Sequence, residues 1–405
     1  MSTKQTVEKL GALSQKWLEK DFSFRQKAAK RLEGSSGFSK KMAEAMLDAL
    51  FSELTPPKLW KLLRAELKNP AALDGFVRDG ERRVRASGPG TILHVFSSNI
   101  PGAAVTSFVM GLLVGSNNIG KVSRRDGGIL SIYLDSLRVH DAALAKHCRI
   151  VHARGEAARL SRMADFVVAY GDDPSLANIR KHLRAKTPFV GYGHRVSLSL
   201  VLSEALNKKG AAALAKRTAF DVWMADQRGC LSPVLVYAQK GGKVRAKDFA
   251  ALIARELERF EKSETSRPRR SHEDHVAMHN LRNLLCVQAL KGRQSAIWAS
   301  QKDRWAVGYD EKLDLHYANG AQIVRVKGFH RLSELETHLQ KLSGSLQAAS
   351  LECGASHRQK IAEWLSLFGI NRICRAGKMQ RPPITWHHDG RLNLASWLTW
   401  TDLEK

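Results

Sequence analysis

The sequence predicts an α/β fold with two parallel-sheet domains behind a helical N-terminal region. Short apolar runs of strand length end in loops that contain glycine or proline, and helical patterns separate these runs. Strands that alternate with helices form parallel sheets covered by helices on both faces. The chain has 405 residues, of which 43% are hydrophobic, and this is enough for two cores.

The first 80 residues have the spacing of helices. Apolar residues recur at steps of three and four in Met42–Leu50 and Leu59–Leu67, and Pro56 and Pro57 separate the two runs. Because proline suits the first turn of a helix, the second run is expected to begin there. We therefore expect a helical N-terminal region over residues 1–90, packed on the domain that follows.

Residues 91–193 are predicted to form the first sheet domain. The expected strands are 91–96, 118–122, 149–152, 165–170 and 187–191, with helices over 103–113 and 129–137 and from residue 175. Ligands of parallel sheets bind beyond the carboxyl ends of the strands. The loops after Phe96 and Tyr170 are therefore candidate site loops.

Residues 194–390 are predicted to form the second sheet domain, and residues 391–405 a returning C-terminal strand. The expected helices are Ser199–Leu206, 213–222 and 246–261, and the expected strands are 234–237, 296–299, 305–309 and 322–326.

The charge balance favours anionic partners. Lys and Arg number 65 against 39 acidic residues, a formal net charge of +26, and such a surface attracts anions. Nucleic acid, dinucleotide phosphates, coenzyme A and acidic carrier proteins all remain candidates. The basic residues form no arm or tail, and the aromatic residues do not interleave with them as in single-strand binders.

The cysteines indicate a reducing compartment. There are five, an odd number with no CxxC pair, which argues against a disulfide framework and a zinc ribbon. The N-terminal residues carry no signal-peptide pattern, and no apolar stretch approaches the roughly 18 residues of a membrane span. A cytoplasmic protein is expected.

Cys230 is the sharpest single feature of the sequence. It follows Gly229 and precedes Leu231-Ser232-Pro233, where a strand begins, and small residues let a ligand approach closely. The alternative is a buried and inert thiol. The other four cysteines lie in helical or strand patterns and are expected to be of that inert kind.

Four blocks of the sequence resemble the LuxC-type acyl-CoA reductases, fatty-acid reductases within the aldehyde dehydrogenase superfamily. The blocks are HVFSSNIPG at 94–102, VVAYGDD at 167–173, DQRGCLSP at 226–233 and WHHDGRLNLASWLTW at 386–400. The resemblance implies an aldehyde-dehydrogenase-like fold with two Rossmann-like domains. It also implies NADPH-dependent reduction of an acyl thioester, on coenzyme A or a carrier protein, to an aldehyde.

The resemblance assigns catalytic roles to particular residues. Cys230 takes the place of the nucleophile that forms an acyl-enzyme, and Asn99 that of the amide that stabilises the oxyanion. A simple turn residue is the alternative for Asn99. The segment Gly191–Arg195 lacks the glutamate base of aldehyde-oxidising relatives, which suits a reductase. His194 is a candidate acid–base residue, and a structural histidine is the alternative.

The same resemblance places the cofactor in the first sheet domain. Lys121 matches a lysine that touches the adenosine ribose, and Gly171 a glycine at the pyrophosphate turn. Ser123, Arg124 and Arg125 follow Lys121, and basic residues there favour NADPH over NADH. An exposed basic turn is the alternative for these three residues.

Two further patterns concern metals and partners. His272, His275 and His279 have helical spacing, which we assign to a solvated helix face and not to a metal site. The family implies a homo-oligomer with contacts near the C-terminus, and an acyl-transferring or acyl-activating partner enzyme. The competing functions are an aldehyde dehydrogenase working in the oxidative direction, a nucleic-acid-binding protein and a catalytically inactive scaffold.

Overall fold

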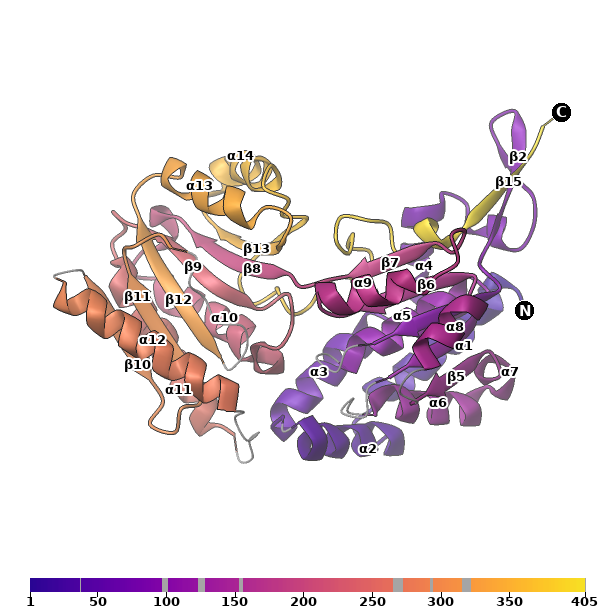
Figure 1. Ribbon diagram of the computed structural model, residues 1–405, viewed down its shortest axis with the longest axis horizontal. Coiled ribbons are helices and arrows are strands. Elements are labelled where there is room, and N and C mark those ends of the chain that lie inside the picture. Colours follow the sequence, from indigo (N-terminus) through magenta and orange to yellow (C-terminus); the bar gives the residue numbers. More distant parts are fainter. Residues whose placement is uncertain are drawn as a thin grey trace. The chain divides into compact units, whose positions relative to one another are not determined.

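The computed structural model describes residues 1–36, 38–96, 101–122, 128–152, 156–264, 272–291, 294–314 and 322–404. These residues form two compact units (Figure 1). The first comprises Met1–His194 with Pro383–Lys405, and the second comprises Arg195–Pro382. Each unit is described by itself.

The N-terminal part of the first unit is helical. Its helices are α1 (Thr3–Leu18), α2 (Ser23–Arg31), α3 (Lys40–Ser52) and α4 (Pro56–Leu67), with a π-helical turn at Leu32–Ser36 and a 3₁₀ turn at Pro70–Leu73. Helix α4 begins at Pro56, as the two adjacent prolines predict. The Trp17 ring stacks on Phe51 at 4.4 Å between centroids, and its indole N–H donates to Ser136 on α6 (Ile129–His140). These contacts pack the N-terminal helices on the adjoining sheet domain.

A five-stranded parallel sheet forms the centre of the first unit, as predicted. Its order is β5-β4-β3-β6-β7. The strands are β3 (Thr91–Val95), β4 (Asn117–Lys121), β5 (Cys148–Val151), β6 (Phe166–Tyr170) and β7 (Phe189–Tyr192), and the helices are α5 (Pro101–Leu113), α6 (Ile129–His140), α7 (Ala142–Ala145), α8 (Glu156–Met163) and α9 (Asp173–Lys181). The chain runs outward from β3 in one direction and returns to β6 on its other side. In open sheets such a reversal marks the ligand-binding edge.

Residues 77–87 depart from the helical expectation for 1–90, because they form two strands. β1 (Val77–Asp79), β2 (Arg82–Ser87) and β15 (Thr399–Leu403) make a small antiparallel sheet. Val84 and Ala86 are buried while their neighbours Arg83 and Arg85 are exposed, an alternation that belongs to a strand.

The C-terminal segment belongs to the first unit from Pro383 onward, although we expected residues up to 390 in the second domain. The Ile384 N–H donates to Glu53, and the Asn393 and Leu394 N–H groups donate to Glu66. Glu53 and Glu66 belong to the helical region, so the return segment is fastened there. A 3₁₀ turn at Ala395–Trp397 leads into β15.

The second unit is built on a seven-stranded sheet of order β10-β11-β12-β9-β8-β13-β14, in which only β10 is antiparallel to its neighbour. The strands are β8 (Val196–Val201), β9 (Pro233–Gln239), β10 (Ser295–Ala299), β11 (Ala306–Asp310), β12 (Ile323–Phe329), β13 (Leu346–Glu352) and β14 (Arg372–Cys374). The helices are α10 (Ala211–Trp223), α11 (Ala246–Lys262), α12 (His272–Leu290), α13 (Ser333–Leu342) and α14 (Ala355–Ser366), with 3₁₀ turns at Ser203–Ala205 and Met224–Gln227.

The helix expected at Ser199–Leu206 is wrong. Val196–Val201 is a strand, and all six of its residues are buried. β8 lies in the interior of the sheet between β9 and β13, so both of its faces are covered. The segment Val196-Ser197-Leu198-Ser199-Leu200 alternates apolar and polar residues, which is the period of a strand and not of a helix.

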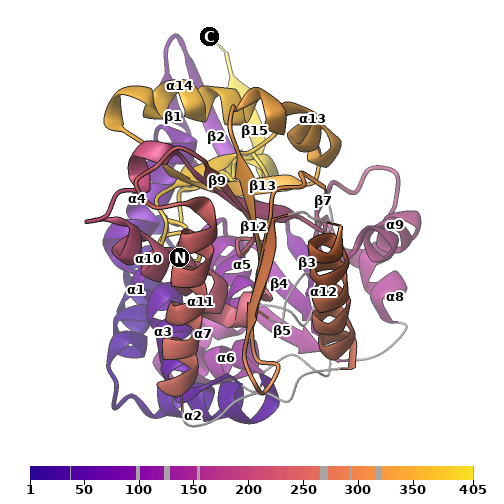
Figure 2. The same ribbon diagram turned by 90° about the vertical axis from the view of Figure 1, so that its left-hand side faces the viewer.

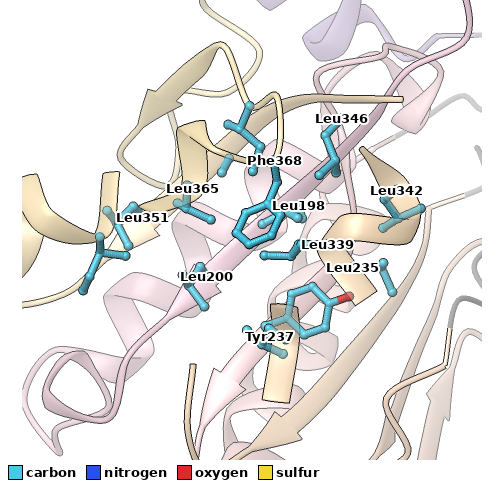
Figure 3. Packing of buried hydrophobic residues seen from close by; sticks show 14 of the residues in the cluster. Leu198, Leu200, Leu235, Tyr237, Leu339, Leu342, Leu346, Leu351, Leu365 and Phe368 are labelled. Carbon is cyan, nitrogen blue, oxygen red and sulfur yellow. The ribbon is translucent and has the colours of Figure 1, made fainter. Parts of the chain in front are cut away.

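Helices cover both faces of the second sheet. Leu339, Leu365 and Phe368 from the α13 and α14 side meet Leu198 and Leu200 of β8 (Figure 3). On the other face α10 and α11 run side by side (Figure 2). Among the described residues no helix is long and apolar enough to cross a membrane.

Candidate functional site

The loop that carries Cys230 joins α10 to the start of β9. Cys230 itself is half-buried, whereas Gly229 before it and Leu231 after it are buried. The Ser232 N–H donates to the Gly229 carbonyl at 2.9 Å, so residues 229–232 form a tight turn. The thiol therefore stands on a compact turn at the amino end of a central strand.

The backbone just before this turn is strained. Ala225, Asp226 and Gln227 have φ angles of 55°, 54° and 57°, three non-glycine residues in succession in the left-handed region. Each such residue costs on the order of 1–3 kcal/mol and persists only where the surroundings enforce it. Strained backbone of this kind is concentrated at functional sites, and hydrogen bonds from neighbouring segments must hold it in place here.

Side chains from three directions fix the loop. The buried Gln227 amide bonds to the backbone of β9 and β12. The Ser197 hydroxyl on β8 donates to the Cys230 carbonyl oxygen at 2.6 Å. The Gln380 amide donates to the Ser232 hydroxyl at 2.6 Å. With both ends and its middle bonded, the loop holds Cys230 in one backbone geometry.

A buried carboxylate lies behind the Gln380 contact. Asp221, at the end of α10, accepts hydrogen bonds from the Gly377 N–H at 2.6 Å and the Met379 N–H at 3.1 Å. Burial raises the pKa of Asp221 to about 7, although both hydrogen bonds act in the opposite direction. This residue shapes the segment that presents Gln380 to the cysteine loop.

Arg372 is a buried cation of this region. Its guanidinium donates to the carbonyls of Met379 and Lys378 at 2.7 Å each. Burial lowers the pKa of Arg372, and interaction with Cys374, Asp221 and Cys230 acts in the other direction. Arg372 thus lies within electrostatic reach of the candidate nucleophile.

Three of the other four cysteines have a raised pKa, which makes them less suited to act as nucleophiles. Burial raises the pKa of Cys148 to about 12 and that of Cys374 to about 11, and it also raises the pKa of Cys353. Their thiolates are therefore scarce at neutral pH. Cys286 was expected to be buried like these, but it is exposed on α12, next to Leu285 on the buried side of that helix.

The predicted cofactor residues lie in the first unit. Lys121 ends β4 and is half-buried, and no carboxylate within the described ranges forms an ion pair with it. Gly171 follows β6, separated from β4 only by β3, so both lie at the carboxyl edge of the sheet. Asp172 caps α9 by accepting from the Ser175 N–H at 2.8 Å, which already places a carboxylate at that helix start. Ser123, Arg124 and Arg125 lie outside the described residues.

Of the two other predicted catalytic residues, His194 is described by the structure and lies in the first unit. His194 is exposed and is the last residue of that unit before Arg195. Asn99 lies outside the described residues. Among the side chains that the structure describes, no group of three or more His, Cys, Asp or Glu is arranged to hold a metal ion.

Sequence reasoning missed a column of stacked rings at the carboxyl edge of the first sheet. Phe96 stacks on Tyr170 at 5.6 Å, and Tyr170 on Tyr192 at 4.8 Å. Tyr192 stacks on His388 at 4.0 Å, and His388 on Trp386 at 4.7 Å. The block at 386–390 was recognised as a family motif. Its sequence does not indicate that His388 stacks on Trp386 and on Tyr192, the tyrosine at the end of β7.

Comparison with known proteins gives a family and a fold. The family described as acyl-CoA reductase (LuxC) matches residues 1–400. The long-chain acyl-protein thioester reductase of Aliivibrio fischeri is 24% identical over 247 residues, which are 58% of this chain and 50% of that protein. The second such reductase of Photobacterium leiognathi is 24% identical over 245 residues, with the same two shares. The chain thus spans about half the length of the curated relatives it matches.

Solved structures agree on the architecture. An NAD-dependent aldehyde dehydrogenase from Sinorhizobium meliloti superposes with a TM-score of 0.74 at 13% identity, covering 100% of this chain and 82% of that one. A glyceraldehyde-3-phosphate dehydrogenase from Methanocaldococcus jannaschii, solved with NADP, gives 0.70 at 11% identity, with shares of 100% and 90%. These likenesses confirm the predicted aldehyde-dehydrogenase-like fold. On that fold, and with the family match running over nearly its whole length, the chain belongs to the LuxC family of acyl-CoA reductases.

Proposed function

We propose that this protein reduces an acyl thioester to an aldehyde with NADPH, through an acyl-cysteine on Cys230. The observation that carries the proposal is the half-buried Cys230 on a strained loop held by Gln227, Ser197 and Gln380. An inert cysteine needs no such support. Membership of the LuxC family and the names of the thioester reductases that resemble the chain point the same way.

In the first step the Cys230 thiolate attacks the thioester carbonyl carbon. The bond between that carbon and the leaving sulfur breaks, the free thiol departs with a proton, and the acyl group stays on Cys230. We assign the removal of the Cys230 proton to His194. The Asn99 amide and the Cys230 N–H would stabilise the charge that develops on oxygen, and one such donor is typically worth about 3–4 kcal/mol of barrier.

The second step returns Cys230 to its starting state. A nicotinamide cofactor held by Lys121 and Gly171 would supply the hydride needed to bring the acyl carbon to the aldehyde level. Cys230 then leaves as a thiolate while the carbonyl of the aldehyde re-forms. Between the two steps, Cys230 must keep its acyl group away from water.

The absence of a glutamate base supports the reductive direction. Residues 191–195 read Gly-Tyr-Gly-His-Arg, with no carboxylate to activate water against the acyl-enzyme. Oxidation of an aldehyde to an acid needs that hydrolysis. The acyl-cysteine is therefore expected to live long enough to be reduced.

We place the cofactor on the first unit. Lys121 fits the ribose because its ammonium stands at the carboxyl edge of the sheet without a described carboxylate partner. Ser123, Arg124 and Arg125 follow it, and arginines suit a ribose 2′-phosphate, which favours NADPH. Gly171 is assigned to the pyrophosphate turn, although the carboxylate of Asp172 weakens that assignment.

The substrate and partners follow from charge and from the relatives. A net charge of +26 suits acyl-CoA and acidic carrier proteins alike. The curated relatives are named for acyl-protein substrates, which adds weight to a protein-bound acyl group and to a partner enzyme that transfers or activates it. We also propose a homo-oligomer with contacts near β15. The free thiols of all five cysteines support a cytoplasmic setting.

The first experiment is the oxidation of NADPH in the presence of a panel of acyl-CoAs and acyl carrier proteins. We expect oxidation that depends on the thioester, releases free thiol and disappears in Cys230→Ala. Cys286→Ala removes an exposed cysteine on α12 and is expected to keep full activity. Failure of the wild-type chain to bind any nicotinamide cofactor would contradict the proposal and favour the scaffold or nucleic-acid hypotheses.

A further inference from the structure

The sheet of the second unit has a gap where the cysteine loop meets it. Strands β12 and β9 pair in parallel from Arg325 and Leu235 onward. Two residues earlier on each strand, Ile323 comes opposite Pro233. Proline has no N–H group, so the ladder cannot continue through that pair. On its other side, Ile323 is paired with Ala306 of β11.

The side chain of Gln227 fills this gap. Its Nε2 donates to the Pro233 carbonyl at 3.0 Å and to the Ile323 carbonyl at 2.8 Å. Its Oε1 accepts from the Ile323 N–H at 2.8 Å. One amide thus bonds to the donor and acceptor of Ile323 and to the carbonyl of Pro233. The side chain is buried, and it acts as a short piece of strand between β9 and β12.

This arrangement ties the cysteine loop to two adjacent interior strands of the sheet, β9 and β12. Gln227 is the last of the three left-handed residues, and Cys230 follows three positions later. Next to Gln227, the Asp226 carboxylate accepts from the Gln322 amide at 2.9 Å and pairs with Arg228 at 3.2 Å. Gln322 and Ile323, at the start of β12, therefore hydrogen-bond to the side chains of the consecutive loop residues Asp226 and Gln227.

We propose that Gln227 is a positioning residue for Cys230. The Gln227 amide supplies the hydrogen bonds that are missing between β9 and β12 at Pro233. It thereby fixes the point at which the loop joins the sheet, and with it the position of the Cys230 thiol. The proposal rests on the assignment of Cys230 as nucleophile in the proposed function. The position and environment of the Cys230 thiol can nevertheless be measured without any acyl substrate.

The test compares Gln227→Met with a matched control at the other end of the same strand. Gln239 ends β9, and its amide also bonds to backbone, accepting from the Ser203 N–H at 3.1 Å and donating to the His330 carbonyl at 3.0 Å. Six steps along the strand separate it from Pro233, about 20 Å. Gln239→Met therefore removes similar backbone hydrogen bonds far from the cysteine loop. Gln227→Asn is a milder second variant, because asparagine tolerates a left-handed backbone but is one methylene too short to span the gap.

The main readout is the pH profile of Cys230 alkylation by iodoacetamide, followed by mass spectrometry of the Cys230 peptide. We expect the midpoint of this profile to move by about half a unit or more in Gln227→Met and Gln227→Asn, a threefold change in thiolate equilibrium. We expect no movement in Gln239→Met. For thioester reduction, kcat should fall about tenfold or more in both Gln227 variants with little change in KM.

Two outcomes separate this inference from the proposed function. If the wild-type chain reduces no thioester but the alkylation midpoint still moves only in the Gln227 variants, Gln227 positions Cys230 and the proposed function is wrong. If Gln227 and Gln239 variants lose similar thermal stability and share the wild-type midpoint and kcat, Gln227 is a purely structural residue and the inference is overturned.

Discussion

The Ser197 hydroxyl donates a 2.6 Å hydrogen bond to the carbonyl oxygen of Cys230. Ser197 lies on β8, an interior strand of the seven-stranded sheet, whereas Cys230 lies on the turn that opens β9. A rigid strand thereby holds the peptide group of the candidate nucleophile directly. The carbonyl is fixed on one side of the residue, and the thiol is presented on a backbone that cannot rotate freely.

Ser197→Ala is expected to reduce turnover more than it reduces stability. Loss of one hydrogen bond should cost about 1 kcal/mol of unfolding free energy, measured by urea denaturation. The freed Cys230 peptide should lower kcat/KM about fivefold. Ser199→Ala is the matched control, since Ser199 lies two residues along β8 and its hydroxyl bonds instead to the Ser350 hydroxyl at 2.6 Å. Equal losses of kcat/KM in the two variants would contradict a specific role for the Ser197 bond.

Asp221→Asn is expected to change how stability depends on pH. Burial raises the pKa of Asp221 to about 7 in the folded chain, above its ordinary value of 3.8. The folded state therefore holds a proton between these values that the unfolded state has lost. The contribution of this group is complete below about pH 4 and is lost as the pH rises through 7.

The measurement is the melting temperature of both proteins from about pH 5 to pH 8, the range in which the wild-type carboxyl loses its proton. Asparagine stays neutral, so the wild-type melting temperature should fall more steeply with rising pH than that of the variant. Parallel curves would mean that the Asp221 pKa is not raised.

His388→Ala is expected to destabilise the first unit. The His388 ring lies between Tyr192 at 4.0 Å and Trp386 at 4.7 Å, so its removal opens the column of rings. Loss of these stacking contacts should cost about 1–2 kcal/mol in urea denaturation. His387→Ala is the control, because His387 is the adjacent residue and is exposed, and it should change stability by less than about 0.5 kcal/mol. Similar effects of the two substitutions would show that the column contributes nothing measurable.

Much of the fold is predictable from the sequence because its strands end in clear turns. β3 and β6 were placed correctly, since each is an apolar run that stops at a Ser- or Gly-containing loop. β8 was mistaken for a helix although Val196–Leu200 alternates apolar and polar residues with the period of a strand. β13 and β14 were not anticipated. The turns between elements were therefore reliable signals, and the period of Val196–Leu200 was a correct signal that the helix prediction did not use.

The candidate site was predictable only in part. The flanks of Cys230 indicate an accessible turn, and the structure places the residue half-buried on one. The residues that hold it are distant in sequence: Ile323 lies 96 positions from Gln227, and Gln380 lies 148 positions from Ser232. No local pattern reveals such pairs. Pro233 was the one available signal, because a proline that opens an interior strand leaves its neighbour in need of another partner.

The most direct test of the central claim is to trap the acyl-enzyme. The wild-type chain is mixed with a long-chain acyl thioester in the absence of NADPH, and the protein is digested and analysed by mass spectrometry. The account predicts one acyl group on the peptide that contains Cys230, released as aldehyde when NADPH is added and absent in Cys230→Ala. An acyl group on any other residue, or aldehyde formed at an undiminished rate by Cys230→Ala, would contradict it.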